Sequence, residues 1–295
     1  MAAIANTTTA AQITTSVREI DFISRFTANI NALREIMGIA APIRKQPGTK
    51  LVSSKATVTL QSGAVAEGEE VPLSQVKIVP VAYEDIVLGK YRKAVTAEAV
   101  SKHGAAVAVQ KTDDAFIHEL QGVITDDFYS FIQTGALKGE ETTFQMAVSM
   151  AVAKVKDKFK KMRMDHSNIV VMVNTIDAGR YLGSANITVQ TTNGIEYVKD
   201  FVGVETMIIT SEIPEGTVIA TPAENLVMYY IDPADGDFQE LGLEYTTSYD
   251  EVSLIGVHKE GNYGRVMGET HALMGIKIFA DYIDAVAVYS ITAAE

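Results

Sequence analysis

The chain has 295 residues, 47% of them hydrophobic and 21% charged, which is enough for one large or two ordinary globular domains with a hydrophobic core. Its net charge of −12 is uneven: residues 201–260 hold twelve acidic side chains and one basic one, which argues against a nucleic-acid-binding face over most of the chain. The same charge is also typical of a solvated acidic surface. Cysteine is absent, which excludes disulfides, thiolate nucleophiles and cysteine metal sites and fits synthesis in a reducing cytoplasm.

The N-terminal residues predict neither secretion nor a membrane anchor. Residues 1–16 are mostly Ala, Thr and Asn without a pattern, so we expect a mobile arm, and they lack the basic and apolar regions of a secretory signal. Residues 1–50 hold six basic and three acidic side chains, which would let this arm contact something acidic. No 18-residue apolar run occurs in the chain, so nothing is expected to span a membrane.

A first helix and a long β-ribbon are predicted next. Apolar residues recur at helical spacing between Val17 and Met37, and Gly38 can end the helix. Residues 51–60 then alternate, as in a half-buried strand, and the acidic turn VAEGEEVP leads to a second run over 76–81. We expect Pro72 and Pro80 at the ends of these strands. The ribbon would have two exposed edges, which is a liability unless another chain covers them.

Two long amphipathic helices follow a short one opened by Thr96. The sequence Thr112-Asp113-Asp114 is expected to cap the first long helix, and Gly135 follows its end. Its apolar stripe consists of Ile117, Leu120, Ile124, Phe128 and Phe131. A second helix is predicted from Glu141 to about Met164. Its lysine run, Lys154 to Lys161, could contact an anion or DNA, but it is more typical of a solvated helix face.

The remainder of the chain predicts mostly strands. Residues 168–174, NIVVMVN, form a short buried strand followed by a helical turn over 175–181. Strands are then expected at ITVQT, VETMIIT, TVIATP, LVMYYI and VSLIGVH and, after a glycine-rich turn, over the last thirty residues. The fold class is therefore α+β, with mostly antiparallel or mixed sheets.

No catalytic, cofactor or metal motif stands out. No GxSxG, GxxxxGK[ST] or GxGxxG pattern occurs at a suitable place, and no histidine belongs to an HExxH pattern. His258 and His271, near Glu260 and Glu269, could support a hydrolase, although two histidines on adjacent strands are more often surface residues. We therefore expect no enzyme, no cofactor and no metal.

The order of these pieces resembles the major capsid proteins of tailed phages, which have the Hong Kong 97-type fold. The matching stretches are AEGEEVPLSQVKI as the extended loop, KYRKAVTAEAVSKHG after it, TDDAFIHELQGVITDDFYSFIQTG as the spine helix and VSLIGVHKEGNYGRVMGETHALMGIKIFADYIDAVAVYSI as the closing strands. The resemblance covers nearly the whole chain. It implies an N-terminal arm and short helix (1–40), an extended β-hairpin loop (41–85), a peripheral domain with the spine helix (86–140), an apical α/β domain (141–235) and a return to the peripheral domain with the closing strands (236–295).

The resemblance implies a structural function. The chain would assemble into hexamers and pentamers of an icosahedral shell around double-stranded phage DNA, which it would contact weakly at its inner surface. It would be made in the host cytoplasm and located in the virion. The arm is short, so a separate scaffolding protein or prior cleavage is implied, together with a portal. The alternative is an encapsulin-like compartment that encloses cargo enzymes.

The resemblance also suggests where neighbouring copies meet. In such shells the extended loop lies across a neighbour, so Glu67, Glu69 and Glu70 at its tip would face basic groups. The candidates are Arg34, Arg92 and Lys93. The alternative is a solvated acidic turn, because exposed ion pairs are common and weak.

Overall fold

The structure of the chain, a computed structural model, contains a five-stranded sheet, a seven-stranded sheet and a two-stranded ribbon. It describes residues 17–46, 48–49, 52–82, 85–183, 189–192, 194–201, 203–248 and 252–292. The expected N-terminal arm over residues 1–16 lies outside these residues. The helices are α1 (Val17–Ile36), α2 (Ala97–His103), the π-helical η2 (Ala106–Gln110), α3 (Lys111–Ile132), α4 (Phe144–Met162), α5 (Thr175–Leu182) and α6 (Gly236–Glu240), with 3-10 turns η3 (Ala223–Asn225) and η4 (Ile283–Ala285).

The five-stranded sheet is built around one long strand. Its members are β1 (Ile43–Lys45), β4 (Gly89–Thr96), β11 (Leu226–Ile231), β12 (Ile255–Asn262) and β13 (Met267–Ala280). The first half of β13 pairs antiparallel with β12 on one side and β4 on the other, and its second half pairs with β11. The strand β1 pairs parallel with β11 at the edge. Three strands therefore run side by side at the distal end of the sheet.

The seven-stranded sheet is buried on both faces at its centre. In spatial order it contains β5 (Leu137–Glu141), β14 (Ala287–Ile291), β10 (Thr217–Pro222), β6 (Ile169–Asn174), β9 (Val204–Thr210), β8 (Ile195–Phe201) and β7 (Gln190–Thr192). Every residue of β6 is buried, which explains its continuous apolar sequence. Val171 and Val173 pack on the α4 side, whereas Val170 and Met172 belong to the cluster that contains α1 and α3.

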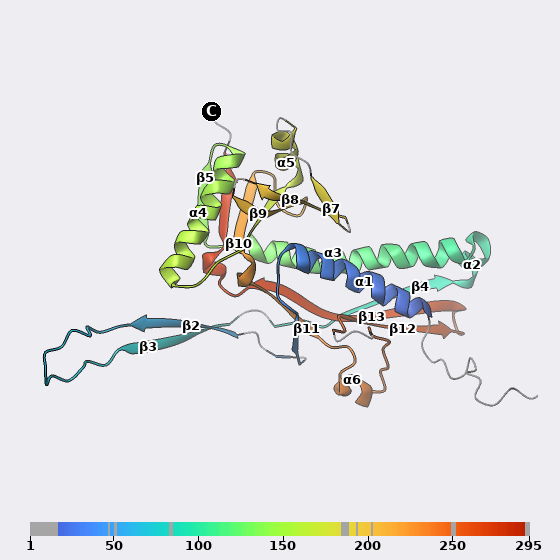
Figure 1. Cartoon of the computed structure of the whole chain (residues 1–295). Helices are drawn as coiled ribbons and strands as arrows, with labels where there is room; N and C mark the ends of the chain where they lie inside the picture. Colours follow the sequence, from blue (N-terminus) through green and yellow to red (C-terminus); the bar gives the residue numbers. More distant parts are fainter. Residues whose placement is uncertain are drawn as a thin grey trace, which may run out of the picture.

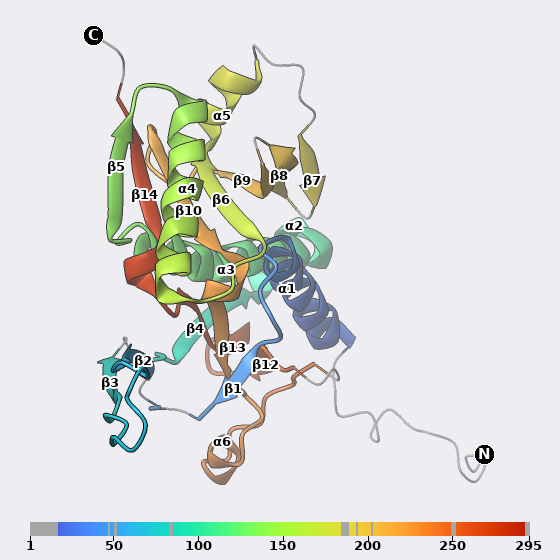
Figure 2. The same ribbon diagram turned by 60° about the vertical axis from the view of Figure 1, so that its left-hand side comes forward.

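The helices α1 and α3 lie between the two sheets (Figure 1). Their buried side chains meet Met228, Val257 and Met274 of the five-stranded sheet and Ile208 of the seven-stranded sheet in one apolar cluster. The predicted stripe of α3 is confirmed, with Ile117, Leu120, Ile124 and Phe128 buried and Phe131 partly buried. The helix α4 covers the opposite face of the seven-stranded sheet (Figure 2).

The predicted ribbon projects far from both cores (Figure 1). The strands β2 (Val52–Thr59) and β3 (Gln75–Ala82) pair antiparallel from Val52↔Ala82 to Thr59↔Gln75. They pair with no other strand among the described residues. Pro80 lies within the ladder, opposite Ser54, rather than at its end. A proline is tolerated there because both strands of a two-stranded ribbon are edge strands.

Two predicted helix starts are wrong. Thr112 does not cap α3, because the chain is already helical from η2 onward and the Thr112 hydroxyl donates backward to the carbonyls of Ala108 and Val109. Glu141 is the last residue of β5, and α4 begins after Thr143, whose hydroxyl accepts a hydrogen bond from the amide of Met146. Thr96 does cap α2 as predicted, by accepting from the amide of Ala99.

The fold class is α+β, as predicted, with parallel pairs β1–β11, β5–β14 and β6–β9 among antiparallel ones. The strands β1, β4, β5 and β8 and the helix α6 were not predicted from the sequence. Of the predicted strand ITVQT, residues 187–188 lie outside the described residues, and its end is confirmed as part of β7. Lys154, Lys156, Lys160 and Lys161 are exposed on α4, as a solvated face requires. Within the described part of the chain, no helix is long and apolar enough to cross a membrane.

Candidate functional site

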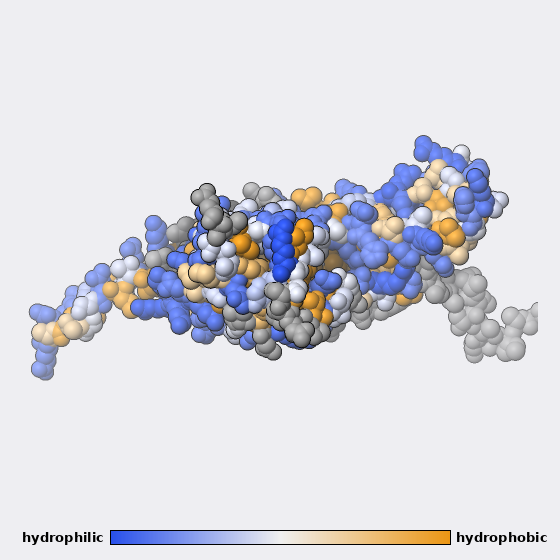
Figure 3. Space-filling model, turned by 90° about the horizontal axis from the view of Figure 1, so that it is seen from above, coloured by the Kyte–Doolittle hydropathy of each residue, from blue (hydrophilic) through white to orange (hydrophobic). Residues whose placement is uncertain are grey.

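The projecting ribbon exposes apolar side chains along its length and around its tip. Leu73 is 92% exposed, and five further large apolar residues of the ribbon are exposed: Val58, Leu60, Val71, Val76 and Ile78. In the space-filling view, hydrophobic residues are visible on the ribbon, at the left (Figure 3). An isolated hairpin with exposed apolar residues and unpaired edges is a typical surface for contact with another chain.

The acidic turn at the ribbon tip has a defined conformation that its own hydrogen bonds stabilise. Gly68 has φ +89°, which favours glycine. The amide of Glu69 donates to the carbonyl of Ala66 at 3.1 Å, and the Glu69 carboxylate accepts from the Ala66 amide at 3.3 Å. Glu67, Glu69 and Glu70 are all exposed. The turn therefore presents three carboxylates to the outside of the chain.

The three candidate basic partners lie outside the ribbon, and each of them has a different environment. Arg34 is mostly buried, and its nearest carboxylate in a described ion pair is Glu35 at 3.9 Å. The side chain of Arg92 is 51% exposed and contacts Glu269 at 2.7 Å. That of Lys93 is only 14% exposed and pairs with Asp113. No described ion pair of the chain joins Glu67, Glu69 or Glu70 to these residues, so any such pairing requires a second copy.

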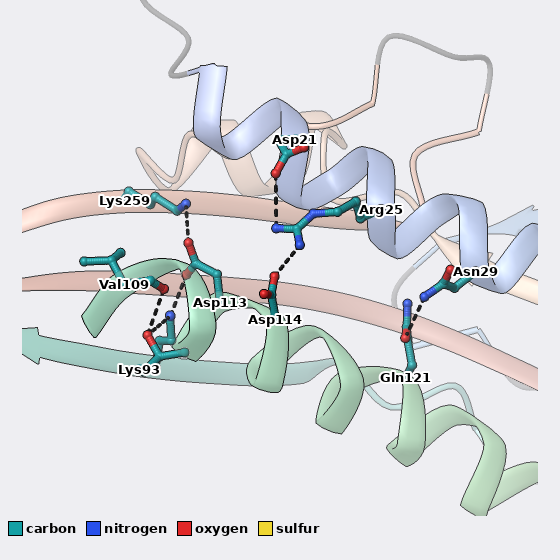
Figure 4. Close-up of polar contacts among 10 residues, drawn as sticks. Asp21, Arg25, Asn29, Lys93, Val109, Asp113, Asp114, Gln121 and Lys259 are labelled. Atoms are coloured by element: carbon teal, nitrogen blue, oxygen red, sulfur yellow. Dashed lines mark hydrogen bonds and ion pairs between the residues drawn. The ribbon is translucent and has the colours of Figure 1, made fainter. Parts of the chain in front are cut away.

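Lys93 belongs to an ionic cluster that the sequence did not predict. Asp113 is 2% exposed and pairs with Lys93 of β4 and with Lys259 of β12, the latter at 3.6 Å (Figure 4). The two ammonium groups also lie near the rings of Phe116 and Phe22, respectively. One buried carboxylate thus joins α3 to two strands of the five-stranded sheet. The only sequence signal was the Asp113 carboxylate, which was interpreted as part of a helix cap.

Further polar contacts hold α1 against α3. Arg25 pairs with Asp21 at 3.1 Å and with Asp114 of α3, and the Asn29 amide donates to Gln121 at 3.2 Å (Figure 4). The hydrogen bond to Asp114 raises the pKa of Arg25 further, so this guanidinium stays charged. These contacts fix the position of α1. The buried side chains of α1 in the apolar cluster hold it in the same position.

Asp113→Asn should lower the free energy of unfolding by about 1.5–3 kcal/mol, the usual worth of hydrogen bonds to charged groups. The substitution keeps the shape of the side chain but leaves the ammonium groups of Lys93 and Lys259 without their shared carboxylate. Denaturant unfolding of the unassembled chain measures the loss. Asp114→Asn is the matched control, because its pair with Arg25 is exposed and should cost less than about 1 kcal/mol. Equal losses in both variants would contradict the conclusion that the buried Asp113 carboxylate stabilises the fold by joining α3 to the five-stranded sheet.

A pair of acidic side chains lies where α3 meets the loop after β9. Burial and a hydrogen bond with Asp126 of α3 raise the pKa of Glu212. A raised pKa means that the folded chain holds this proton more tightly than the unfolded chain does. The contact therefore favours the folded state at low pH, and its contribution is lost as the pH rises through the pKa of Glu212.

A cavity lies at the end of the molecule opposite the ribbon. It has a volume of about 740 Å³ and lies between α2, η2 and the ends of β4, β12 and β13. Gly261 and Gly268 are register partners in its wall, and a Cβ at either would meet no atom within 4 Å. Val95, Val100 and Val109 are among the apolar lining residues. The absence of side chains on the paired glycines leaves this space open.

An exposed turn borders the same cavity. Tyr263 is 97% exposed, and the neighbouring Val266 has φ +50°, which is strained for a β-branched residue. The carbonyl of Val266 accepts a hydrogen bond from the amide of Ala97 at the start of α2, which holds the turn in this conformation. An exposed aromatic ring beside a cavity with apolar lining is typical of a surface that contacts another chain.

The two histidines considered for a hydrolase do lie on adjacent strands. His258 and His271 are register partners in β12 and β13, with ring centroids 6.3 Å apart. Neither lines the cavity described above. A hydrolytic site places its catalytic groups in a concave pocket, so this geometry gives the hydrolase interpretation no support.

Comparison with known proteins identifies the fold. No family model and no curated protein matches the sequence. Among solved structures, a Mycobacterium phage Ogopogo chain is 11% identical, with a TM-score of 0.55 over 87% of this chain and 91% of that one. The capsid of Cyanophage P-SCSP1u is 8% identical, with a TM-score of 0.52 over 86% and 87%. An encapsulin complex from Synechococcus elongatus is 9% identical, with a TM-score of 0.54 over 99% and 94%. The chain therefore has the Hong Kong 97-type capsid fold.

Proposed function

We propose that this chain, which has the Hong Kong 97-type capsid fold, is a major capsid protein whose copies assemble into an icosahedral shell around the double-stranded DNA of a tailed phage. The observation that carries the proposal is the projecting ribbon. Its exposed apolar residues and open strand edges have no partner strand among the described residues of their own chain. A neighbouring copy is the partner that would cover them.

The positions of the two exposed surfaces favour rings. The ribbon and the helix α2, whose residues line the distal cavity, lie at opposite ends of the molecule (Figure 1). A contact between two different surfaces of identical copies is heterologous, and it closes into a ring when the rotation between copies allows it. We infer that such contacts build hexamers and pentamers, in which Leu73 and its apolar neighbours are buried against the next copy.

The acidic tip of the ribbon would be neutralised by a neighbour. Of the three proposed partners, Arg92 has the most exposed side chain, and its guanidinium has donors beyond the one that contacts Glu269. Lys93 is held by Asp113 and Arg34 is mostly buried, so both are less accessible. We therefore propose Arg92 as the first partner to test for Glu67, Glu69 and Glu70.

The charge of the chain is compatible with a container for DNA. A shell with a net charge of −12 per copy would contact packaged DNA weakly, and tight phosphate binding would oppose packaging and release. In this proposal the chain has no catalytic role, and a separate scaffolding protein and a portal direct assembly. The chain would be made in the host cytoplasm and located in the virion.

An encapsulin-like compartment is the second candidate. It is favoured by the likeness to the Synechococcus elongatus encapsulin complex, which covers nearly the whole of both chains. The contents of the particle separate the two functions: a phage shell would protect DNA from nuclease, whereas a compartment would contain protein cargo.

The purified chain, expressed alone and with its neighbouring genes, should form closed particles of uniform size. Negative-stain electron microscopy and light scattering measure this directly, and nuclease treatment followed by nucleic-acid and protein analysis identifies the contents. The repeated weak contacts of a shell predict assembly that depends steeply on concentration. A stable monomer of about 32 kDa under all these conditions would contradict the proposed function.

A further inference from the structure

Two histidines and two glutamates share one face of the β12–β13 hairpin. His258 lies opposite His271, and Glu260 lies opposite Glu269. Because side chains alternate along a strand, these four residues point away from Val257, Lys259 and Ala272, which face α1 and α3. Two carboxylates directly opposite each other repel and destabilise a β-ladder unless something compensates them.

The imidazole of His271 lies between the two carboxylates. Its Nε2 is 3.2 Å from Oε1 of Glu260 and 3.5 Å from Oε2 of Glu269, and the three atoms all lie within 4.8 Å of one another. Two ligands that each lie about 2.1 Å from a tetrahedral ion are separated by about 3.4 Å. Both separations from Nε2 therefore match those of atoms that share one ion.

Two neighbouring side chains orient the carboxylate of Glu269. Asn262 donates to its Oε1 at 2.9 Å and Arg92 contacts its Oε2 at 2.7 Å. These two contacts hold the Glu269 carboxylate in a fixed orientation. A carboxylate oxygen has a second lone pair, so Oε2 can contact Arg92 and still face an ion. Such outer contacts are usual for ligating carboxylates.

We propose that Glu260, Glu269 and His271 bind a divalent first-row metal ion, with Zn²⁺ as the best match. One imidazole and two carboxylates supply three protein ligands of the kinds that Zn²⁺ accepts, and water takes the fourth position. The two carboxylates and Arg92 together carry a charge of −1, so the site attracts a cation. The ion joins β12 to β13 and removes the repulsion between the two glutamates. This inference does not depend on shell formation.

Titration of the chelator-treated full-length chain with ZnCl₂ by isothermal calorimetry tests the site. One ion per chain should bind, and the melting temperature should rise with the logarithm of free Zn²⁺, because the ion binds only the folded state. Co²⁺ in place of Zn²⁺ should give the visible absorption of a tetrahedral complex. Glu260→Gln and His271→Ala should each weaken binding by more than the roughly 10–100-fold that loss of an outer contact usually costs.

Two controls keep the result interpretable. His258→Ala removes the other histidine of the same face, whose ring does not contact the carboxylates in any described hydrogen bond or ion pair, and it should leave Zn²⁺ affinity within about twofold. Glu260 is 54% exposed, so Glu260→Gln should fold normally, and circular dichroism in chelator checks this. Absence of saturable binding, or equal losses in His258→Ala and His271→Ala, would overturn the site and leave the three residues as a simple ion-pair cluster.

Discussion

Replacing residues 60–74 with Asn-Gly should leave a folded chain that no longer forms shells. Thr59 and Gln75 are the last register partners of the ribbon, so a two-residue turn can join them directly, and Asn-Gly favours such a turn. None of the replaced residues belongs to a buried apolar cluster. The segment does contain Leu60, Val71, Leu73 and the acidic turn, which we propose to be covered by the neighbouring copy.

Size-exclusion chromatography with light scattering and electron microscopy measures the outcome. We expect monomers or small rings, with the circular dichroism spectrum of unassembled wild-type subunits. Gln61→Ala, a neutral and exposed change in the same segment, serves as the control and should assemble normally. Particles of ordinary size from the shortened chain would show that the ribbon faces solvent, and the shell proposal would lose its main support.

Charge reversal of Glu67, Glu69 and Glu70 to Lys tests the same contact more gently. An exposed ion pair is worth at most about 1 kcal/mol, but the loss recurs in every copy of a shell. The variant should therefore assemble less completely than the wild type. Wild-type assembly should itself weaken at high salt, where the remaining pairs are screened. If reversal changes neither yield nor salt dependence, the acidic turn is solvated and Arg92 is not its partner.

The parts of the fold that the sequence predicted are those with a local period. The stripe from Ile117 to Phe131 repeats at helical spacing over several turns, so burial of one face follows from the pattern alone. The continuous apolar run of residues 169–174 likewise predicted a strand covered on both faces. By contrast, β8 carries Glu196 and Lys199 among its apolar residues, and this mixed sequence gave no clear period.

Long-range contacts were missed because they depend on the topology. Lys259 contacts Asp113 from a strand 146 positions later in the chain, and the pairing exists only because β12, β13 and β4 lie side by side beneath α3. The same reason applies to Glu260, Glu269 and His271, which the sequence placed near one another without their register. Thr112 shows the opposite case: its local sequence matches a helix cap, but the preceding η2 had already begun the helix.

Phe128→Ala should destabilise the unassembled chain by about 3–5 kcal/mol, the usual cost of removing a buried phenyl ring. Phe128 is fully buried in the cluster that joins α1 and α3 to both sheets, and its ring lies 5.2 Å from that of Tyr129. For a chain of this size the loss corresponds to a decrease in melting temperature of about 5–8 °C. Because α3 lies between the two sheets, the cavity left by the ring cannot close without moving one of them.

The shortened-ribbon chain is the proper background for this measurement, because shell contacts would otherwise add to the stability of each copy. Val123→Ala is the matched control: Val123 lies on the same helix but is exposed, so its truncation should change the free energy of unfolding by less than about 0.5 kcal/mol. A similar small change for Phe128→Ala would mean that α3 does not form the core between the sheets. A large loss confined to Phe128→Ala would show that this face of α3 packs in the core between the two sheets.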